Sequence, residues 1–175
     1  MRLRGRLQLH NYGRTVIGDR VRLDGTIVPL DFTCGEEALL EIGEGTFINY
    51  GTSIGATERV SIGRNCDIGQ YAIILDNDFH STVEHTSPGV SRPVVIEDDV
   101  WIGARVAILP GAHIGRGAVI GTHSVVRGHI PPRTLAAGVP ARVVRYLDAP
   151  EHTEAGAEPD TEAAAEGRLA PTIPN

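Results

Sequence analysis

An apolar residue recurs every six positions through the middle of the chain, and this period constrains the fold more than any other feature. The recurring positions are Ile96, Ile102, Ile108, Ile114, Ile120 and Val126, three of them followed by glycine. A helix shows apolar recurrence near 3.6 residues and an ordinary strand near 2, so a period of six fits neither alone. It fits short strands joined by tight turns, each strand pointing one apolar side chain inward. The sequence therefore predicts an all-β solenoid.

A second, smaller position accompanies each of these anchors two residues earlier. Its residues are small or β-branched: Val94, Val100, Val106, Ala112, Ala118 and Ser124. Side chains two apart in a strand point the same way, so we expect one large and one small side chain in each inner layer. Aromatic residues make up only 5% of the chain, which suits a narrow interior.

The same period is present earlier in the chain, with one insertion. The earlier anchors are Ile42, Ile48, Ile54, Ile62, Ile68 and Ile74. The step from Ile54 to Ile62 is eight, which predicts a bulged turn around residues 56–58. Weaker anchors at Ile17 and Leu23 predict a degenerate first coil, as is usual for terminal repeats.

Two segments depart from the period, and they divide the chain. Residues 76–93 are predicted to form a long loop that leaves the coil, and such loops are more often functional than decorative. Residues 148–175 contain seven acids and one base, which account for the net charge of −6. This segment is predicted to be a disordered acidic tail, because it cannot bury enough apolar surface to order itself. The solenoid domain, residues 1–147, is then electrically neutral.

Composition excludes several classes of protein. Neither part of the chain has the concentrated basic face of a nucleic-acid binder. No apolar run approaches the length of a membrane span, and the first ten residues lack the apolar core of a signal peptide. The two cysteines, Cys34 and Cys66, form no CxxC motif, which favours a reducing compartment. We expect a cytoplasmic protein with no membrane partner, in which Cys66 serves packing.

Four blocks of sequence carry a resemblance to a known family. Three of them are VWIGARVAILPGAHIG, then IGTHSVV followed by IPP, then AAGVPARVVR, and the fourth comprises FINYGTSI, VSIGRNCDIG and DNDFH upstream. In this order they closely resemble the hexapeptide-repeat acyltransferases, in the galactoside, maltose and nodulation-factor O-acetyltransferase branch. The resemblance covers residues 42–146. Hexapeptides alone are weakly specific, whereas the ordered combination of these motifs is strongly specific.

The resemblance implies a fold, an assembly and a reaction. It implies a left-handed parallel β-helix and a homotrimer with three active sites, each between two subunits. It also implies acetyl-CoA as the donor, a sugar or glycoside as the acceptor, and no required metal. The activity implied is an acetyl-CoA-dependent O-acetyltransferase that works by general-base catalysis in a ternary complex.

His80 matches the catalytic histidine of that family, at the entry of the long loop. Transfer to an alcohol requires a base, and an imidazole with a pKa near ~6.5 suits that task near pH 7. Asp78 lies two residues earlier, on the same face if the segment is extended, and is a candidate to orient the imidazole. Asp76 and Glu84 are alternative orienters, and simple solvation is the other reading of all three acids.

Asn49 matches the asparagine that binds the acceptor in the family, and its alternative reading is a turn residue. Eight residues later the sugar O-acetyltransferases carry an acid that holds a substrate hydroxyl. This chain has Thr57 there, with Glu58 adjacent. The N-terminal helical segment of the family, which contributes another acid, is also missing. The resemblance therefore does not extend to galactosides or maltose as acceptors.

Seven positions match the coenzyme A site of the family: Trp101, Ala104, Thr122, Arg127, Gly128, Arg142 and Arg145. Exposed backbone groups of the coil are expected to pair with the pantetheine amides, as an added strand does. The guanidinium groups of Arg142 and Arg145 are expected near the nucleotide phosphates.

The same sequence features leave three other functions open. An amino-sugar N-acetyltransferase needs the same base. A γ-type zinc carbonic anhydrase uses the same coil with three histidines, and His80 with His85 invites that reading, with His113 and His123 expected on regular turns. The flanks of these histidines resemble the acetyltransferases instead. A non-catalytic trimeric scaffold, whose acidic tail recruits a partner, is the last alternative.

Overall fold

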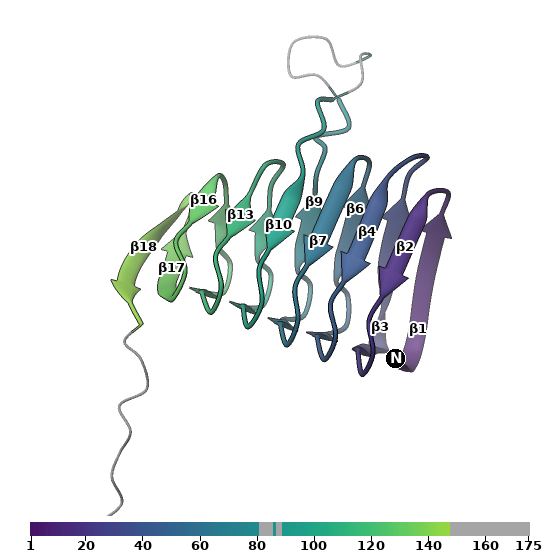
Figure 1. Cartoon of the computed structure of the whole chain (residues 1–175), viewed down its shortest axis with the longest axis horizontal. Coiled ribbons are helices and arrows are strands. Elements are labelled where there is room, and N and C mark those ends of the chain that lie inside the picture. The colour runs from purple at the N-terminus through teal and green to yellow at the C-terminus, as the bar shows by residue number, and fades with distance from the viewer. Residues whose placement is uncertain (81–85, 87–88, 148–175) are drawn as a thin grey trace, which may run out of the picture.

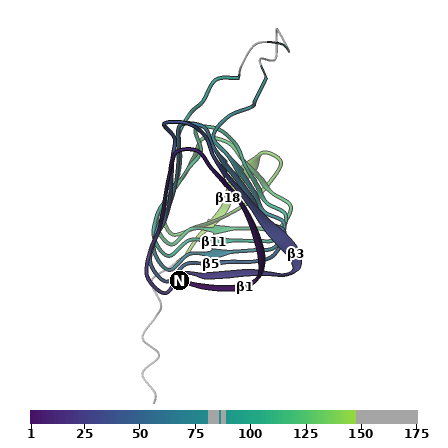
Figure 2. The same cartoon turned by 90° about the vertical axis from the view of Figure 1, so that its right-hand side faces the viewer.

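The chain forms a β-solenoid of triangular cross-section, whose coils stack along one axis (Figures 1 and 2). The computed structural model describes residues 1–80, 86 and 89–147. The predicted acidic tail, residues 148–175, lies outside the described residues, as do residues 81–85 and 87–88 of the loop. The predicted parallel solenoid is confirmed.

Each coil contributes one short strand to each of three faces. The first face comprises β2 (Arg14–Ile17), β4 (Leu39–Ile42), β7 (Arg59–Ile62), β10 (Val94–Ile96), β13 (His113–Ile114) and β16 (His129–Ile130). The second face comprises β5 (Phe47–Ile48), β8 (Asp67–Ile68), β11 (Trp101–Ile102), β14 (Val119–Ile120) and β17 (Thr134–Gly138). The third face comprises β6 (Ser53–Ala56), β9 (Ile73–Leu75), β12 (Ala107–Ile108) and β15 (Val125–Val126). We call the corner between the second and third faces the second corner, and the corner between the third and first faces the third corner.

The predicted anchors fill the interior. All twelve positions of the six-residue period are at most 2% exposed: Ile42, Ile48, Ile54, Ile62, Ile68, Ile74, Ile96, Ile102, Ile108, Ile114, Ile120 and Val126. The six smaller partners two residues earlier in the later coils are buried as well. The anchors of successive coils are paired in register, so that similar side chains stack on one another along the axis. One such column consists of Ile68, Ile102 and Ile120.

The N-terminal coils differ from the predicted degenerate repeat. β1 (Arg2–Asn11) and β3 (Arg22–Cys34) are long strands that pair with each other, and β3 continues from the second face round the second corner onto the third face. Glycine permits their close approach, since a Cβ atom on Gly25 would lie 2.0 Å from the Arg6 carbonyl oxygen. Leu23 is buried as an anchor, whereas Ile17 is only partly buried.

The two irregularities of the period lie where the sequence predicts them. β6 ends at Ala56 and β7 begins at Arg59, so residues 57 and 58 form the inserted turn. The long loop leaves the coil between β9 and β10, at the third corner, and projects away from the prism (Figure 2). An antiparallel bridge between Asn77 and Ser91 joins its two ends.

The C-terminal end closes differently from the rest. β18 (Ala141–Tyr146) turns back and pairs antiparallel with β17, which extends the second face by one reversed strand. In the part of the chain that the structure describes, no helix is long and apolar enough to cross a membrane.

Truncation of one anchor tests the stacked core. We expect Ile74→Ala to lower the free energy of unfolding by about 2–5 kcal/mol, because Ile74 is fully buried and its column cannot collapse to fill the cavity. Ile27→Ala is the matched control, since Ile27 is 69% exposed. Denaturant unfolding measures both, and equal losses would contradict an interior built on the six-residue period.

The cysteines provide a second test. Cys34 and Cys66 are both buried, and burial raises the pKa of the Cys66 thiol to about 11. Because the thiolate is the reactive species, we expect neither cysteine of the native protein to react with a thiol reagent at pH 8. Both should react after unfolding in denaturant. Rapid labelling of Cys66 in the native state would show that its coil opens.

Candidate functional site

Four of the predicted site residues come together at the second corner. Asn49, Trp101, Ala104 and Thr122 line one hollow of about 460 Å³. They come from three coils, and each lies in or just after a strand of the second face. Register brings them together, because strands of successive coils stack directly on one another. We call this the second-corner hollow.

The hollow offers both polar and apolar groups. Asn49 accepts a hydrogen bond from the Tyr50 backbone N–H at 2.8 Å through its Oδ1 atom, which fits the turn reading of this residue. No acceptor among the described residues pairs with its Nδ2 group, so that group can donate to a ligand. The Trp101 side chain stands outward on the second face and is 58% exposed. The hollow can therefore pack a flat ligand and bind a hydroxyl.

A second group of predicted residues lies at the third corner, near the C-terminal end. Arg127, Gly128 and Arg142 line a hollow of about 560 Å³, whose walls include Val139 and Pro140. Arg142 reaches this place because the reversed strand β18 pairs it with Ala137 of β17. We call this the third-corner hollow. Arg145 lies further along β18, exposed and opposite Leu135, and does not line it.

The base of the long loop adjoins the third-corner hollow. Asp78, Arg92 and Arg127 line a small hollow of about 230 Å³, together with Leu109 and Pro110. Arg127 and Leu109 line both hollows, so loop and corner share one surface. The Asp78 Oδ2 atom lies 3.6 Å from a guanidinium nitrogen of Arg92. Sequence reasoning missed Arg92, which lies two residues before Val94, where the period returns.

His80 is exposed and is the last residue that the structure describes before residues 81–85 of the loop. Its backbone N–H donates to the Asp78 carbonyl oxygen at 2.7 Å, and Phe79 between them has a φ of +61°. The segment is therefore not extended, which was the premise for placing Asp78 beside the imidazole. Since the Asp78 carboxylate pairs with Arg92, its role as an orienter of His80 stays a prediction.

Asp76 is a residue whose role the sequence did not reveal. Its side chain is fully buried, in contrast to the solvated acid that was one expectation. Its carboxylate accepts the backbone N–H groups of Thr57, Glu58 and Arg59 at 2.7 to 2.8 Å. Hydrogen bonds of this kind stabilise a buried charge. Asp76 thus fixes the inserted turn of one coil to the start of the loop on the next.

The hydroxyl of Thr57 belongs to the same network. Thr57 Oγ1 donates to Asp76 Oδ1 at 2.8 Å and lies 2.8 Å from Ser91 Oγ. Asn77 Nδ2 donates to that Ser91 hydroxyl at 2.8 Å. These bonds hold the two ends of the loop against the coil below. The use of Thr57 by an acceptor stays a prediction, and here its hydroxyl has a structural role.

The two groups of predicted residues lie at opposite edges of the third face. Asn49 and Trp101 are at the second corner, whereas His80 is at the third. One side of a coil spans about 16 Å, because it holds about five residues at about 3.3 Å each. One copy of the chain therefore does not place the base beside the asparagine.

The histidines of the later coils have other surroundings. His123 lies on a turn as expected, but His113 lies in β13 rather than on a turn. Its Nε2 atom is 2.8 Å from Glu97 Oε1, and this hydrogen bond lowers the pKa of the Glu97 carboxyl, with help from the Arg116 backbone N–H. No group of three metal-ligating side chains occurs among the described residues, which do not include His85.

Replacement of Asp76 tests the network at the loop base. We expect Asp76→Asn to lower the free energy of unfolding by about 2–3 kcal/mol, because an amide cannot accept all the bonds of the buried carboxylate. Asp31→Asn is the control, since Asp31 is an exposed acid on β3 and its change should stay within about 0.5 kcal/mol. Denaturant unfolding compares them, and an equal effect of both variants would contradict the assigned role.

Comparison with known proteins places this chain among bacterial acetyltransferases. The family model described as bacterial transferase hexapeptide (six repeats) matches residues 93–128. The chain is 36% identical over 147 residues to the candidate lipopolysaccharide biosynthesis O-acetyl transferase WbbJ of Escherichia coli K12, covering 71% of this chain and 74% of that protein. It is 30% identical over 161 residues to the galactoside O-acetyltransferase of the same strain, covering 84% and 79%.

A solved structure supports the same assignment. The hexapeptide-repeat acetyltransferase VCA0836 of Vibrio cholerae superimposes with a TM-score of 0.69 and 31% identity, covering 77% of this chain and 74% of that chain. The same protein solved with acetyl coenzyme A gives a TM-score of 0.60 and 29% identity, covering 82% and 72%. With relatives matched over most of their length and its coils in the same arrangement, this chain belongs to the bacterial hexapeptide-repeat transferase family and is an acetyltransferase.

Proposed function

We propose that this protein is an acetyl-CoA-dependent O-acetyltransferase that acts on a hydroxyl group of a sugar or glycoside. The observation that carries the proposal is the second-corner hollow, where Asn49 meets Trp101, Ala104 and Thr122. Four positions that the motifs assign to the acceptor and the donor thus line one cavity. The O-acetyltransferase relatives and the acetyl coenzyme A complex of VCA0836 support the same reaction.

The donor has suitable partners along the third face. Acetyl-CoA supplies an activated thioester carbon when it binds. Arg127 and Arg142 line the third-corner hollow and present guanidinium groups suited to phosphate oxygens. β15 pairs with β12 on one side only, so its outer edge is open to the amides of an extended ligand. Arg145, exposed on the same strand as Arg142, is within the reach of a long nucleotide.

His80 acts as the general base in this proposal. Its imidazole accepts the proton of the acceptor hydroxyl as the oxygen attacks the thioester carbon, and the C–S bond breaks. The imidazolium then passes that proton to the departing thiolate of coenzyme A, so the histidine ends the cycle neutral. Such assistance contributes roughly 10²–10⁴-fold to the rate. No nucleophile of the protein itself takes part.

The separation of the two corners supports an active site shared between subunits. His80 and Asn49 lie at opposite edges of the third face, so they act on one acceptor only if they come from different copies. A cyclic homotrimer satisfies this requirement, because each third corner then faces the second corner of its neighbour. We propose this trimer, and a cytoplasmic location stays a prediction.

Replacement of the base tests the mechanism. We expect His80→Ala to reduce acetyl transfer from acetyl-CoA by at least ~100-fold, with the oligomer and its thermal stability unchanged. His10→Ala is the control, since His10 is exposed on β1. Turnover is measured as free thiol release with a panel of sugars and glycosides, and subunit number by light scattering.

Three outcomes would correct the proposal. Undiminished turnover in the His80 variant would reject the general-base role. A product that resists hydroxylamine, as an amide does and an ester does not, would identify an amino-sugar N-acetyltransferase instead. Absence of turnover by the wild-type protein with every acceptor would favour the scaffold alternative.

A further inference from the structure

The outer surface of the second face carries a column of side chains that begins with arginines. Arg2 pairs in register with Arg22, Arg22 with Phe47, and Phe47 with Asp67, which pairs with Trp101. Four of them point outward, because the residue that follows each is buried in the core, and Arg2 lies on the same side through its register with Arg22. The column therefore leads from the N-terminal coils directly to the second-corner hollow.

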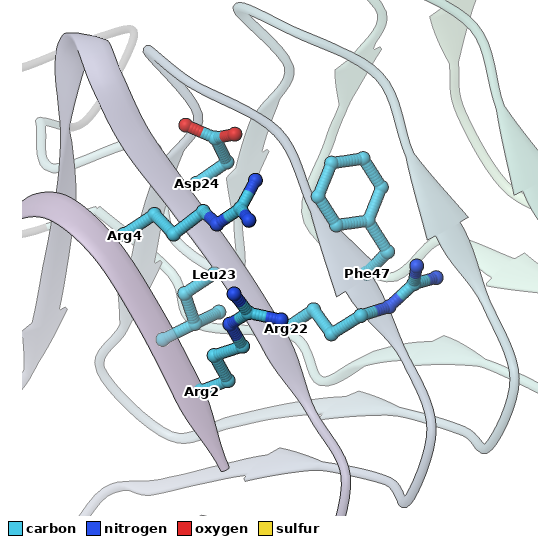
Figure 3. A pocket seen from close by; sticks show the side chains of 6 residues that line it. All are labelled: Arg2, Arg4, Arg22, Leu23, Asp24 and Phe47. Atoms are coloured by element: carbon cyan, nitrogen blue, oxygen red, sulfur yellow. The ribbon is translucent and has the colours of Figure 1, made fainter.

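A separate hollow of about 270 Å³ lies at the start of this column (Figure 3). It is lined by Arg2, Arg4, Arg22, Leu23, Asp24 and Phe47. We call it the arginine hollow. Phe47 also lines the second-corner hollow, so the two cavities are neighbours that share one aromatic wall. A ligand bound at Asn49 can extend past Phe47 into the arginine hollow.

The charges of this hollow are incompletely compensated. Arg22 stacks on Phe47 at 5.1 Å and lies 4.0 Å from Asp67. Among the described residues, no carboxylate lies within 4 Å of the guanidinium groups of Arg2 and Arg4. The Asp24 carboxylate accepts the Thr26 hydroxyl at 2.6 Å and the Thr26 backbone N–H at 3.0 Å. Asp24 is also paired in register with Arg4, and the Thr26 hydrogen bonds, with help from the Arg4 charge, lower the pKa of the Asp24 carboxyl. One carboxylate of the lining thus faces three guanidinium groups.

The arginines are also concentrated at this end of the chain. Residues 1–30 hold six arginines and two aspartates, whereas residues 31–147 hold nine arginines and thirteen acids. The neutral body of the protein thus consists of a basic first segment and an acidic remainder. An anion that approaches the second face is attracted toward the N-terminal coils.

The arginine hollow is distinct from the cationic residues assigned to the donor. Arg142 and Arg145 lie on β18, at the opposite end of the solenoid from β1 (Figure 1). Two groups of exposed arginines at opposite ends suit two different anionic ligands. The arginine group beside Asn49 lies on the side of the proposed acceptor site.

We propose that the arginine hollow binds a phosphate group of the acceptor, so that the substrate is a phosphorylated sugar rather than a neutral glycoside. This inference rests on the proposed function, because it assumes that the sugar hydroxyl binds at Asn49. Neighbouring strands lie about 4.8 Å apart, which places Arg22 and Arg2 about 5 and 10 Å from Phe47. That span matches a phosphate carried one or two sugar rings from the reacting hydroxyl. Guanidinium groups recognise phosphate through paired hydrogen bonds.

The test compares phosphorylated and neutral forms of the same sugars. Wild-type protein is assayed with acetyl-CoA and a panel of hexose 1-phosphates, each beside its methyl glycoside. We expect kcat/KM for the best phosphate ester to exceed that of its glycoside by at least ~10-fold. The double variant Arg2→Gln, Arg4→Gln should lose this preference while the KM for acetyl-CoA stays unchanged. Arg20→Gln is the matched control, since Arg20 lies outside the hollow and pairs with Glu44 at 2.7 Å.

A binding measurement keeps this inference separate from the proposed function. Inorganic pyrophosphate is titrated into each protein by calorimetry in the presence of saturating coenzyme A, which fills the donor site. We expect the wild type to bind it at least ~10-fold more tightly than the double variant. Pyrophosphate binding without any acetyl transfer would support the arginine hollow as an anion-binding site and would reject the proposed function.

Four results would overturn the inference. One is equal turnover of phosphate esters and glycosides by an active wild-type protein. The second is pyrophosphate binding that the double variant does not weaken. The third is a raised KM for acetyl-CoA in the double variant, which would assign the hollow to the phosphates of the donor. Binding of the wild type to vesicles of anionic lipid, without discrimination between the soluble acceptors, would likewise count against it.

Discussion

Stacking of identical inward side chains from coil to coil is the interaction on which the rest of this structure depends. Each isoleucine anchor contacts the anchors above and below it, so burial of apolar surface fixes the register of every strand. Once the register is fixed, every outward side chain has a defined neighbour one coil away. The second-corner hollow and the arginine hollow both follow from this, because residues far apart in the chain meet at successive levels of one face.

The sequence predicted the solenoid well because one local rule generates it. A residue six positions from Ile96 or Ile102 has the same surroundings as its predecessor, so the period specifies the core without any knowledge of distant contacts. The loop and the inserted turn were predicted for the same reason, as breaks in the rule. The long strands β1 and β3 were not, since their residues follow no six-residue period.

The candidate site was predicted less completely, because its contacts cross between coils. The step of eight after Ile54 places Asp76 level with Ala56, but only the folded chain shows that the carboxylate turns inward to bind three backbone N–H groups. The left-handed φ of Phe79 likewise appears only in the folded loop, where the segment from Asp78 to His80 is not extended. By contrast, Asn49 and Trp101 line one hollow because strand register alone unites them.

The reversed strand at the C-terminal end has a consequence for association. A solenoid of parallel strands exposes unpaired backbone groups at both ends, and two such ends can join head to tail into a growing fibre. Because β18 runs antiparallel to β17, the second face ends in a strand whose polarity does not match that of a following coil. Continuation of the solenoid through a further molecule is therefore interrupted on one of its three faces.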